Sequence, residues 1–507
     1  MKRRVLLSIF MLIFACSTVL AACSGSSTSA GEQKELVVAL DADVPTLDPH
    51  MHNEPNAITL NWHIFDSLLF LTSDLKIEPG LAESYEQKDE LTWEFKLKQG
   101  VKFHNGEEFN ADAVKFSLER VLNEEQKSPQ RGNISQIDKV EAVDPYTVVI
   151  KTKEPYNLLP QRLFYLSIVP PKYLQEVGDK EFAEKPVGTG PYKFVEWTKG
   201  DKIVLESNPD YFKGAAKIGK VTFRVIPEVA TQIAELQSGG VDVIRMVPPD
   251  MMAQLEGNSQ IETASVPLLR VFYMAFDTRK KPFDDKRVRQ AMNYAINLDS
   301  IVEKVYGGKA VRTPAGVNPN HFGFDESIQP YPYDPEKAKA LLAEAGYPKG
   351  FETEIHYFTP GTGQQTVDAA ISDLSKVGIK VKAKFYPESS SFVEKQRAGD
   401  LPFRMGHWGS YSVYDADAIL QPMFHSQGVY GKYFNTPELD KLIDQGRSLA
   451  DQGKRKEIYS QAQKLLHDEA PWVFLFSPMD NQAYNAKLNF KARADERIYA
   501  YEIDYKE

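Results

Sequence analysis

The sequence predicts an α/β protein, on three observations. In the central and C-terminal regions, short apolar strands alternate with amphipathic helical segments, which is the pattern of strand–helix units packed in layers. Between about residues 80 and 185 the strand segments instead come in pairs joined by turn residues. The 507 residues, of which 26% are charged and 11% aromatic, have an ordinary globular composition and suffice for about three folding units.

The composition also excludes several classes of protein. The formal net charge of −10 argues against nucleic acid as the main partner, because phosphate binding needs a basic surface. The two cysteines, Cys16 and Cys23, both lie near the N-terminus. The rest of the chain can therefore form neither a disulfide framework nor a cysteine-based zinc site.

The first residues have the pattern of a targeting signal. Three basic residues at 2–4 precede an apolar run over 5–15, which is too short to span a bilayer but has the length of a signal-peptide core. Small residues then lead into Cys23 and a serine-rich stretch, a pattern that resembles the lipobox of bacterial lipoproteins. We expect a lipoprotein signal peptide over 1–22, a lipid on Cys23 and a tether over 23–34. The alternative is an ordinary signal peptide that leaves Cys23 free.

The first half of the body combines hairpins with two helices. A buried strand is expected over 36–40 and a helix over 56–70. Strict alternation over 92–97 predicts a half-exposed strand that turns at 99–100 and pairs with 101–103. A helix is expected to begin after Asn110, its N-cap, and to run to about residue 123. A second hairpin over 140–153 turns at Asp144-Pro145.

The second half alternates strand and helix. Strands are expected in 192–207, 220–226, 241–244, 269–276, 351–358, 379–385 and 472–476, and helices over 229–238, 285–298, 299–306, 365–377, 437–450 and 451–468. A further helix over 334–345 has Asp334 as its N-cap, Pro335 at its first position and Gly346 past its end.

Catalytic and metal-binding signatures are weak in this chain. The sequence contains no G-x-S-x-G, H-E-x-x-H or P-loop motif, so we expect no enzyme, with a hydrolase assembled from distant residues as a minor alternative. His50, His52 and His63 lie close in sequence, but a loop and a helix face explain them better than a metal site, and His104 is attributed to a turn. The run 188–190 is attributed to a strand-entry turn rather than to an anion cradle.

The segment 405–417 is the richest in potential ligand contacts. It follows a strand and holds three aromatic residues, two glycines and the carboxylates of Asp415 and Asp417. Aromatic walls suit a small-molecule cleft, and glycines let a ligand approach the backbone. The alternative is a loop that covers the core, with one aspartate capping the helix that begins near Ala418. We favour the ligand wall for Trp408 and the helix cap for the two aspartates.

Ordered motifs across the chain point to one family. They are EPGLAESY at 78–85, LTWEFKLKQGVKFHNG at 91–106, FNADAV at 109–114, GTGPY at 188–192, NPDYF at 208–212, VRQA at 288–291 and YDPEKA at 333–338. Together they resemble the bacterial extracellular solute-binding proteins of family 5, which serve peptide and nickel ABC importers. The resemblance covers about residues 34 to 480.

The resemblance implies a two-lobed periplasmic-binding-protein-like α/β fold of type II, with an extra subdomain in lobe one. The implied division is a lobe-one core over 35–79 and 186–268, an inserted subdomain over 80–185, lobe two over 269–480, and a C-terminal return to lobe one over 481–507. Crossovers would lie near 267–276 and 477–483, with the ligand enclosed between the lobes by hinge closure.

The resemblance also implies a set of ligand-binding residues. Asp43 would line the cleft from lobe one, and Arg270 and Tyr273 would lie at the hinge. Lobe two would contribute Trp408, Gly409, Ser410, Tyr411, Asp415 and Asp417. Dipeptide-type members tend to have an aspartate where this chain has Ser410 and an arginine near 357–365, where it has none. A longer or modified peptide is therefore expected, and Arg131, Arg270 and Arg404 are candidates for binding its carboxylate.

We therefore expect a monomeric substrate-binding lipoprotein that passes peptides to ABC permease subunits. It would use no cofactor or metal and bind no nucleic acid. The lipid at Cys23 would hold it on the extracytoplasmic side of the cell membrane, on a Gram-positive surface or otherwise in a periplasm. The alternatives are a receptor for a nickel chelate or another small organic solute, and a sensor or chaperone on the same fold.

Overall fold

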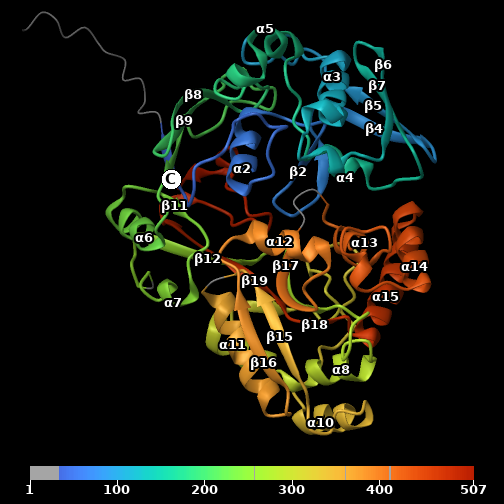
Figure 1. The fold of residues 1–507 in the computed structure, drawn as a ribbon. Coiled ribbons are helices and arrows are strands. Elements are labelled where there is room, and N and C mark those ends of the chain that lie inside the picture. The colour runs from blue at the N-terminus through green and yellow to red at the C-terminus, as the bar shows by residue number, and fades with distance from the viewer. Residues whose placement is uncertain (1–33, 256, 360, 410–412, 507) are drawn as a thin grey trace, which may run out of the picture.

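The computed structural model describes residues 34–255, 257–359, 361–409 and 413–506. The chain forms two lobes that meet face to face (Figure 1). We call lobe one the part built on an eight-stranded sheet and a four-stranded sheet, and lobe two the part built on a five-stranded sheet. The α/β class predicted from the sequence is confirmed.

The large sheet of lobe one is mixed. Its strand order is β12-β19-β11-β1-β10-β9-β8, with β14 pairing on β19. The central strand β1 runs parallel to β10 and β11, and Val38 lies opposite Phe223 and Val243 in these two pairings. The strands are β1 (Glu35–Leu40), β8 (Tyr192–Thr198), β9 (Lys202–Ser207), β10 (Lys220–Val225), β11 (Val243–Ile244), β12 (Ile261–Pro267), β14 (Ala310–Arg312) and β19 (Phe476–Asn485).

Helices and two short ribbons complete the layers of lobe one. Ribbon β2 (Leu69–Leu71) pairs with β3 (Ile77–Pro79), and β20 (Leu488–Asn489) pairs with β21 (Asp504–Tyr505). The helices are α2 (Pro55–Ile64), α5 (Pro171–Phe182), α6 (Val229–Ser238) and α7 (Pro249–Met252). The helix expected over 56–70 ends at Ile64, because Leu69–Leu71 extends to pair with Ile77–Pro79.

The four-stranded sheet lies at one end of lobe one, beside α3 (Figure 1). Its order is β4-β5-β7-β6, from β4 (Ala82–Asp89), β5 (Thr92–Leu97), β6 (Ile137–Asp144) and β7 (Thr147–Thr152), with α3 (Ala111–Leu122) and α4 (Leu159–Leu163) nearby. The hairpin expected between 92–97 and 101–103 is wrong, since β5 pairs with β4 and β7 instead. The hairpin over 140–153 is confirmed.

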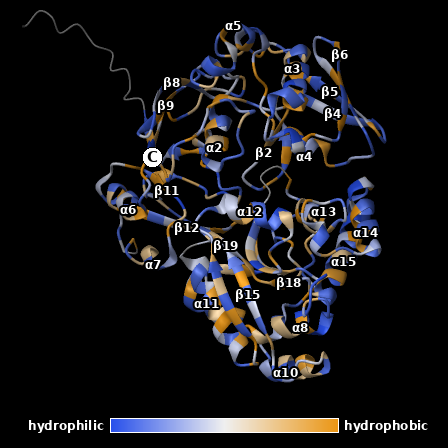
Figure 2. Cartoon of the chain, in the orientation of Figure 1, coloured by the Kyte–Doolittle hydropathy of each residue, from blue (hydrophilic) through white to orange (hydrophobic). Residues whose placement is uncertain are grey.

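Lobe two is a sheet covered by helices. The order β16-β15-β17-β13-β18 is built from β13 (Arg270–Phe276), β15 (Glu352–Tyr357), β16 (Lys380–Phe385), β17 (Phe403–Gly409) and β18 (Trp472–Phe474). Its helices are α8 (Lys286–Ala295), α9 (Leu298–Tyr306), α10 (Pro335–Glu344), α11 (Thr362–Ser375), α12 (Ser389–Ala398), α13 (Asp417–Phe424), α14 (Pro437–Ser448) and α15 (Gln452–Glu469). Hydrophobic and hydrophilic residues mix along α8, α10 and α11, as expected of amphipathic helices on a sheet (Figure 2).

Two local predictions about helix starts are confirmed. The side chain of Asn110 accepts a hydrogen bond from the backbone N–H of Ala113, and that of Asp334 accepts one from Lys337. Both side chains satisfy a backbone donor that the first helical turn leaves unpaired.

The chain passes twice between the lobes. It leaves the large sheet of lobe one between β12 and β13, at Leu268-Leu269, and returns between β18 and β19, at Leu475. Strand β19 spans the junction. Its first residues pair with β14, which belongs to the lobe-two part of the chain, and its later residues pair with β12 of lobe one. Within the described residues, no helix is long and apolar enough to cross a membrane.

Candidate functional site

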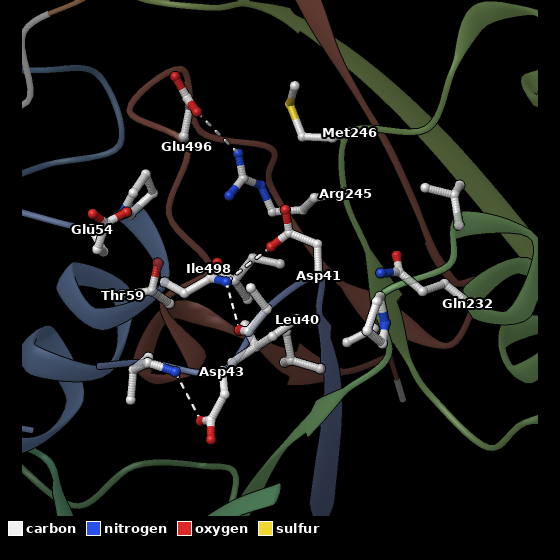
Figure 3. Close-up of a pocket in the computed structure, with 18 of the residues that line it drawn as sticks. Leu40, Asp41, Asp43, Glu54, Thr59, Gln232, Arg245, Met246, Glu496 and Ile498 are labelled. Carbon is white, nitrogen blue, oxygen red and sulfur yellow. Dashed lines mark hydrogen bonds and ion pairs between the residues drawn. The ribbon is translucent and has the colours of Figure 1, made fainter. Parts of the chain in front are cut away.

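A cavity of about 690 Å³ is lined by residues of lobe one together with Arg270 of β13 in lobe two. Figure 3 shows most of its lining. Its floor is the C-terminal end of β1 and the segment 41–45 that follows, and the N-terminus of α2 forms a wall. The volume lies in the range that small-molecule sites occupy. Its charged lining residues are Asp41, Asp43, Glu54, Arg245, Arg270 and Glu496.

Each of the two arginines of this first cavity is paired with a carboxylate. The guanidinium of Arg245 lies 2.7 Å from Asp480 and 3.8 Å from Glu496 (Figure 3). Arg270 Nε donates a hydrogen bond of 2.9 Å to Glu496 Oε1. Burial acts to lower the pKa of Arg245, but Asp480 and Glu496 outweigh it and raise that pKa above its usual value. The guanidinium therefore stays charged inside the cavity.

The carboxylates of this cavity differ in how strongly the protein holds them. Asp43 accepts hydrogen bonds from the backbone N–H groups of Val44 and Gly200 and from the indole N–H of Trp197. Asp41 is exposed and accepts one bond of 2.9 Å from Asn56, while Glu54 is exposed at the start of α2. Asp43 is therefore held rigidly, whereas Asp41 and Glu54 keep most of their acceptor capacity.

A second cavity, of about 600 Å³, lies between the two lobes. Lobe one lines it with residues of 129–136 and with Tyr156, Arg162 and Tyr165. Lobe two lines it with Trp408 and Gly409 at the end of β17, with the first turns of α13, and with Arg397 and Arg447. Since both lobes contribute, a ligand in this cavity contacts both at once.

Trp408 and Asp417 form one wall of the second cavity. The indole N–H of Trp408 donates a 2.7 Å bond to the carbonyl of Ala418, which fixes the ring against α13. Arg447 Nε lies 3.1 Å from Asp417 Oδ1, yet neither atom has a hydrogen-bond partner among the described residues. Burial raises the pKa of Asp417, although Arg447 and Arg162 oppose the shift.

The two cavities adjoin. Arg270 lines the first, and its partner across the β13–β17 pairing, Gly409, lines the second. The consecutive residues Asn53 and Glu54 line the second and the first cavity respectively. A Cβ on Gly409 would lie 2.5 Å from Arg270 Cγ, so glycine here is required by the arginine that crosses it.

The segment after β17 also reaches into lobe one. The ring of Tyr414 stacks on that of Phe164, its N–H donates a 3.1 Å bond to Gln161 Oε1, and Arg497 donates to its hydroxyl at 3.3 Å. Val413 and Tyr414 belong to the apolar core that includes Trp93 and Phe95 of the four-stranded sheet. The structure therefore shows the two lobes in contact around the cavities.

The predicted site residues fall into three groups. Asp43 and Arg270 line the first cavity, and Trp408, Gly409 and Asp417 line the second. Tyr273 and Asp415 line neither, which differs from the prediction. Ser410, Tyr411 and Cys23 lie outside the described residues.

Tyr273 and Asp415 are buried for structural reasons. Tyr273 is 2% exposed and stacks on Trp472, with ring centroids 4.0 Å apart, inside the core of lobe two. Asp415 is fully buried and pairs with Arg455 at 2.7 Å, and it accepts a hydrogen bond from the N–H of Asp417. Burial raises the pKa of Asp415 to about 6, against the pull of Arg455. The N-cap of α13 is Ala416, so neither aspartate is the cap that the sequence predicted. Asp415 nevertheless accepts a hydrogen bond in the turn that begins this helix.

The other arginine candidates do not line either cavity. Arg131 is partly exposed and pairs with Glu124 at 2.6 Å. Arg404 is 1% exposed, with its guanidinium 3.6 Å from the centre of the Tyr433 ring.

The histidines and glycines singled out from the sequence have structural partners. His50 contacts Ser167 O and Arg120, His52 contacts Asn61, and His63 contacts Thr59 O. Burial lowers the pKa of each to about 4. Within the described ranges, no group of three or more metal-ligating side chains is close enough to hold an ion.

The run Gly188-Thr189-Gly190 packs directly against the end of α2. A Cβ on Gly188 would lie 2.0 Å from Ile64 O, and one on Gly190 would lie 2.5 Å from His63 O. His104 Nε2 bonds to Gly190 O at 2.9 Å. The glycines are required by this close approach of two backbones. The run directly precedes β8, in agreement with the strand-entry interpretation.

The sequence matches a family described as bacterial extracellular solute-binding proteins, family 5 middle, over residues 76–431. The chain belongs to this family. It is 33% identical over 483 residues to the glutathione-binding protein GsiB of Pectobacterium atrosepticum, covering 92% of this chain and 93% of that one. This family 5 protein is thus the extracytoplasmic solute-binding component of an ABC importer, and the predictions of family and of a non-enzymatic protein are confirmed.

Solved structures of other proteins share the fold. HbpA2 from Haemophilus parasuis superposes with a TM-score of 0.83 at 27% identity, covering 93% of this family 5 chain and all of that one. DppA from Helicobacter pylori, in complex with the peptide STSA, superposes with a TM-score of 0.78 at 29% identity, covering 93% and 98%. The predicted two-lobed periplasmic-binding-protein fold with an extra subdomain is confirmed.

Several cavity residues had escaped the sequence analysis. Glu54, Arg162, Arg447 and Glu496 come from four distant segments, and none stands in a motif. Two of them contact a residue that the sequence did nominate, since Glu496 accepts a hydrogen bond from Arg270 and Arg447 pairs with Asp417.

Proposed function

We propose that this protein is a peptide receptor, which binds short peptides between its lobes and delivers them to the permease. The observation that carries the proposal is the pair of adjoining cavities at the lobe interface, lined by charged groups of both signs. A peptide has an ammonium, a carboxylate and regularly spaced backbone donors and acceptors. Carboxylates in one cavity and guanidiniums in the other are complementary to the two ends of such a molecule.

The relatives support a peptide as the class of ligand. The name of GsiB states that it binds glutathione, which is a modified short peptide, and the DppA structure holds the peptide STSA. A longer or modified peptide also agrees with Ser410 standing where dipeptide-type members have an aspartate.

The mechanism follows from the shared lining of the second cavity. A ligand that touches Tyr156 on one lobe and Trp408 on the other stabilises only the arrangement in which both are close. A ligand bound to one lobe alone would have equal affinity for open and closed states and would shift nothing. The permease then recognises the closed form of the receptor.

Within this proposal, Asp43, Arg270, Trp408, Gly409 and Asp417 contact the ligand or form the walls around it. Ser410 and Tyr411, which lie outside the described residues, are proposed as further ligand contacts. Tyr273 and Asp415 act as supports in lobe two. The chain division proposed with it is 35–79 and 186–268 for the core of lobe one, 80–185 for the subdomain, 269–480 for lobe two and 481–507 for the return.

Anchoring by a lipid on Cys23 is a separate proposal. A diacylglycerol on this residue would tether the receptor to the outer face of the cell membrane, next to the permease. The substitution Cys23→Ser should release the protein from the membrane fraction in a fractionation experiment. Cys16→Ser is the matched control. A Cys23→Ser protein that stays with the membrane contradicts the anchor.

Isothermal titration calorimetry tests the peptide receptor directly. The protein would first be unfolded and refolded to remove any ligand carried from the cell, and then titrated with tri- and tetrapeptides, with glutathione and with a nickel–histidine chelate. We expect saturable binding of one peptide per chain in the micromolar range or tighter, about −8 kcal/mol. Binding of the chelate with no binding of any peptide contradicts the proposal.

A further inference from the structure

We infer that the cleft is electrically polarised and selects short peptides that carry two carboxylates, with the ligand ammonium in the first cavity and the carboxylates in the second. This inference rests on the proposed function and specifies its substrate class and orientation.

The first cavity has an excess of carboxylates. Four acidic side chains line it, Asp41, Asp43, Glu54 and Glu496, against the two guanidiniums of Arg245 and Arg270. The guanidiniums are already committed, since Arg245 pairs with Asp480 and Arg270 with Glu496. The exposed carboxylates of Asp41 and Glu54 are left facing the space, which favours a cation there (Figure 3).

The second cavity has the opposite charge. Arg162, Arg397 and Arg447 line it, and Asp417 is its acidic lining residue within the described part of the chain. Arg162 is oriented by bonds to Tyr156 OH at 3.0 Å and Asn133 Oδ1 at 3.5 Å, while Arg397 is exposed. Arg447 pairs with Asp417, so Arg162 and Arg397 give this cavity its net positive charge. Planar guanidinium groups match carboxylates in geometry.

Asp417 provides a second observation on the chemistry of this cavity. Its side chain is 2% exposed, and Arg447 Nε lies 3.1 Å from its Oδ1, which accepts no hydrogen bond from any described residue. This oxygen is ion-paired but accepts no well-directed hydrogen bond, so it keeps acceptor capacity for a donor on the ligand. A peptide N–H adjacent to the ligand carboxylates would supply that donor.

Because the two cavities adjoin and carry opposite charge, they set the orientation of the ligand. The boundary runs between Asn53 and Glu54 on lobe one and between Arg270 and Gly409 at the hinge. A short peptide that crosses this boundary places its ammonium beside Glu54 and its C-terminal half beside Arg447. The reverse orientation would put like charges together in both cavities.

Calorimetry on the refolded full chain with four peptides tests the inference. The peptides are Ala-Ala-Asp, Ala-Ala-Ala, Ala-Ala-Lys and N-acetyl-Ala-Ala-Asp. We expect Ala-Ala-Asp to bind at least tenfold more tightly than Ala-Ala-Ala, and Ala-Ala-Lys and the acetylated peptide to bind more weakly than Ala-Ala-Asp by at least the same factor.

Charge-neutralising variants test which cavity binds each end of the peptide. Arg397→Gln and Arg447→Gln should reduce the preference for Ala-Ala-Asp over Ala-Ala-Ala at least threefold, and Glu54→Gln should reduce the loss caused by acetylation. The matched control is Arg131→Gln, which removes an arginine that lines neither cavity. Circular dichroism melting confirms that each variant folds.

The outcomes separate the two proposals. If all four peptides bind equally, or if Ala-Ala-Lys binds best, the polarised cleft is overturned while the peptide receptor stands. If the charge variants leave the preferences unchanged, the assignment of the two ends is overturned. If no peptide binds at all, the proposed function itself fails.

Discussion

Tyr414 of lobe two stacks on Phe164 of lobe one, with ring centroids 5.6 Å apart and ring planes 17° apart. Tyr414 follows β17, the strand that carries Trp408 and Gly409, and Phe164 follows α4. The contact therefore joins the segment that follows the wall of the second cavity to the opposite lobe.

Removing this stack should open the protein. Tyr414→Ala loses the aromatic pair, which is worth about 0.5–1.5 kcal/mol beyond area burial, and the hydroxyl contact with Arg497. We expect a larger radius of gyration in small-angle scattering of the ligand-free variant and at least tenfold weaker peptide binding. Tyr414→Phe, which keeps the ring, should resemble the wild type. A Tyr414→Ala scattering curve identical to that of the wild type contradicts the linkage.

Trp408 is predicted to carry a large share of the binding energy. Trp408→Ala removes a wall of the second cavity and should weaken peptide binding at least tenfold, which is about 1.4 kcal/mol. Trp408→Phe keeps an aromatic wall and should lose less. Trp93→Phe, in the four-stranded sheet, serves as the control in calorimetry. Unchanged affinity in Trp408→Ala removes this residue from the site.

The buried pair of Asp415 and Arg455 should matter for stability. Their side chains are 0% and 7% exposed, so either single alanine variant leaves an unpaired buried charge. We expect each to lower the free energy of unfolding by about 3–5 kcal/mol in denaturant titrations. The double variant Asp415→Leu/Arg455→Met should lose much less than the sum of the singles. Additive losses would show that the two residues act independently.

His321 is predicted to make the protein less stable in acid. The side chain is 6% exposed, neither ring nitrogen has a hydrogen-bond partner among the described residues, and burial lowers its pKa to about 4. Between pH 6.5 and about 4 the unfolded chain binds a proton that the folded chain does not, so stability falls as the pH falls. The contribution is up to about 1.4 kcal/mol per pH unit.

Urea unfolding at pH 7, 6 and 5 checks this prediction. His321→Phe removes the titrating group, so its stability should fall less steeply with pH than that of the wild type. The free energy of unfolding of the variant should still fall somewhat with pH, because burial also lowers the pKa of His50, His63 and His407 to about 4. Equal slopes in the variant and the wild type contradict the assignment.

Local signals in the sequence predicted local structure well. Asn110 and Asp334 were identified as helix caps because the cap, the first turn and the partner N–H all lie within four residues. The false hairpin at 99–103 shows the limit of this reasoning. Strand β5 pairs with β7, about fifty residues later, and no short-range pattern states that pairing.

The same distinction applies to the site. Trp408, Gly409 and Asp417 stand in one conspicuous segment, and Asp43 lies shortly after a predicted strand, so sequence patterns and resemblance sufficed to nominate them. The burial of Asp415 and Tyr273 depends on Arg455 and Trp472, which pack against them from distant segments. The polarity of the cleft could not be predicted either, since it is a sum over side chains from both lobes.

Hydrogen–deuterium exchange with and without a bound peptide tests the central claim most directly, which is that one ligand contacts both lobes. We predict that Ala-Ala-Asp slows exchange together in 41–56 and 156–165 of lobe one and in 404–409 and 413–424 of lobe two. Protection confined to a single lobe, or found only away from these segments, would contradict a receptor that closes around its ligand.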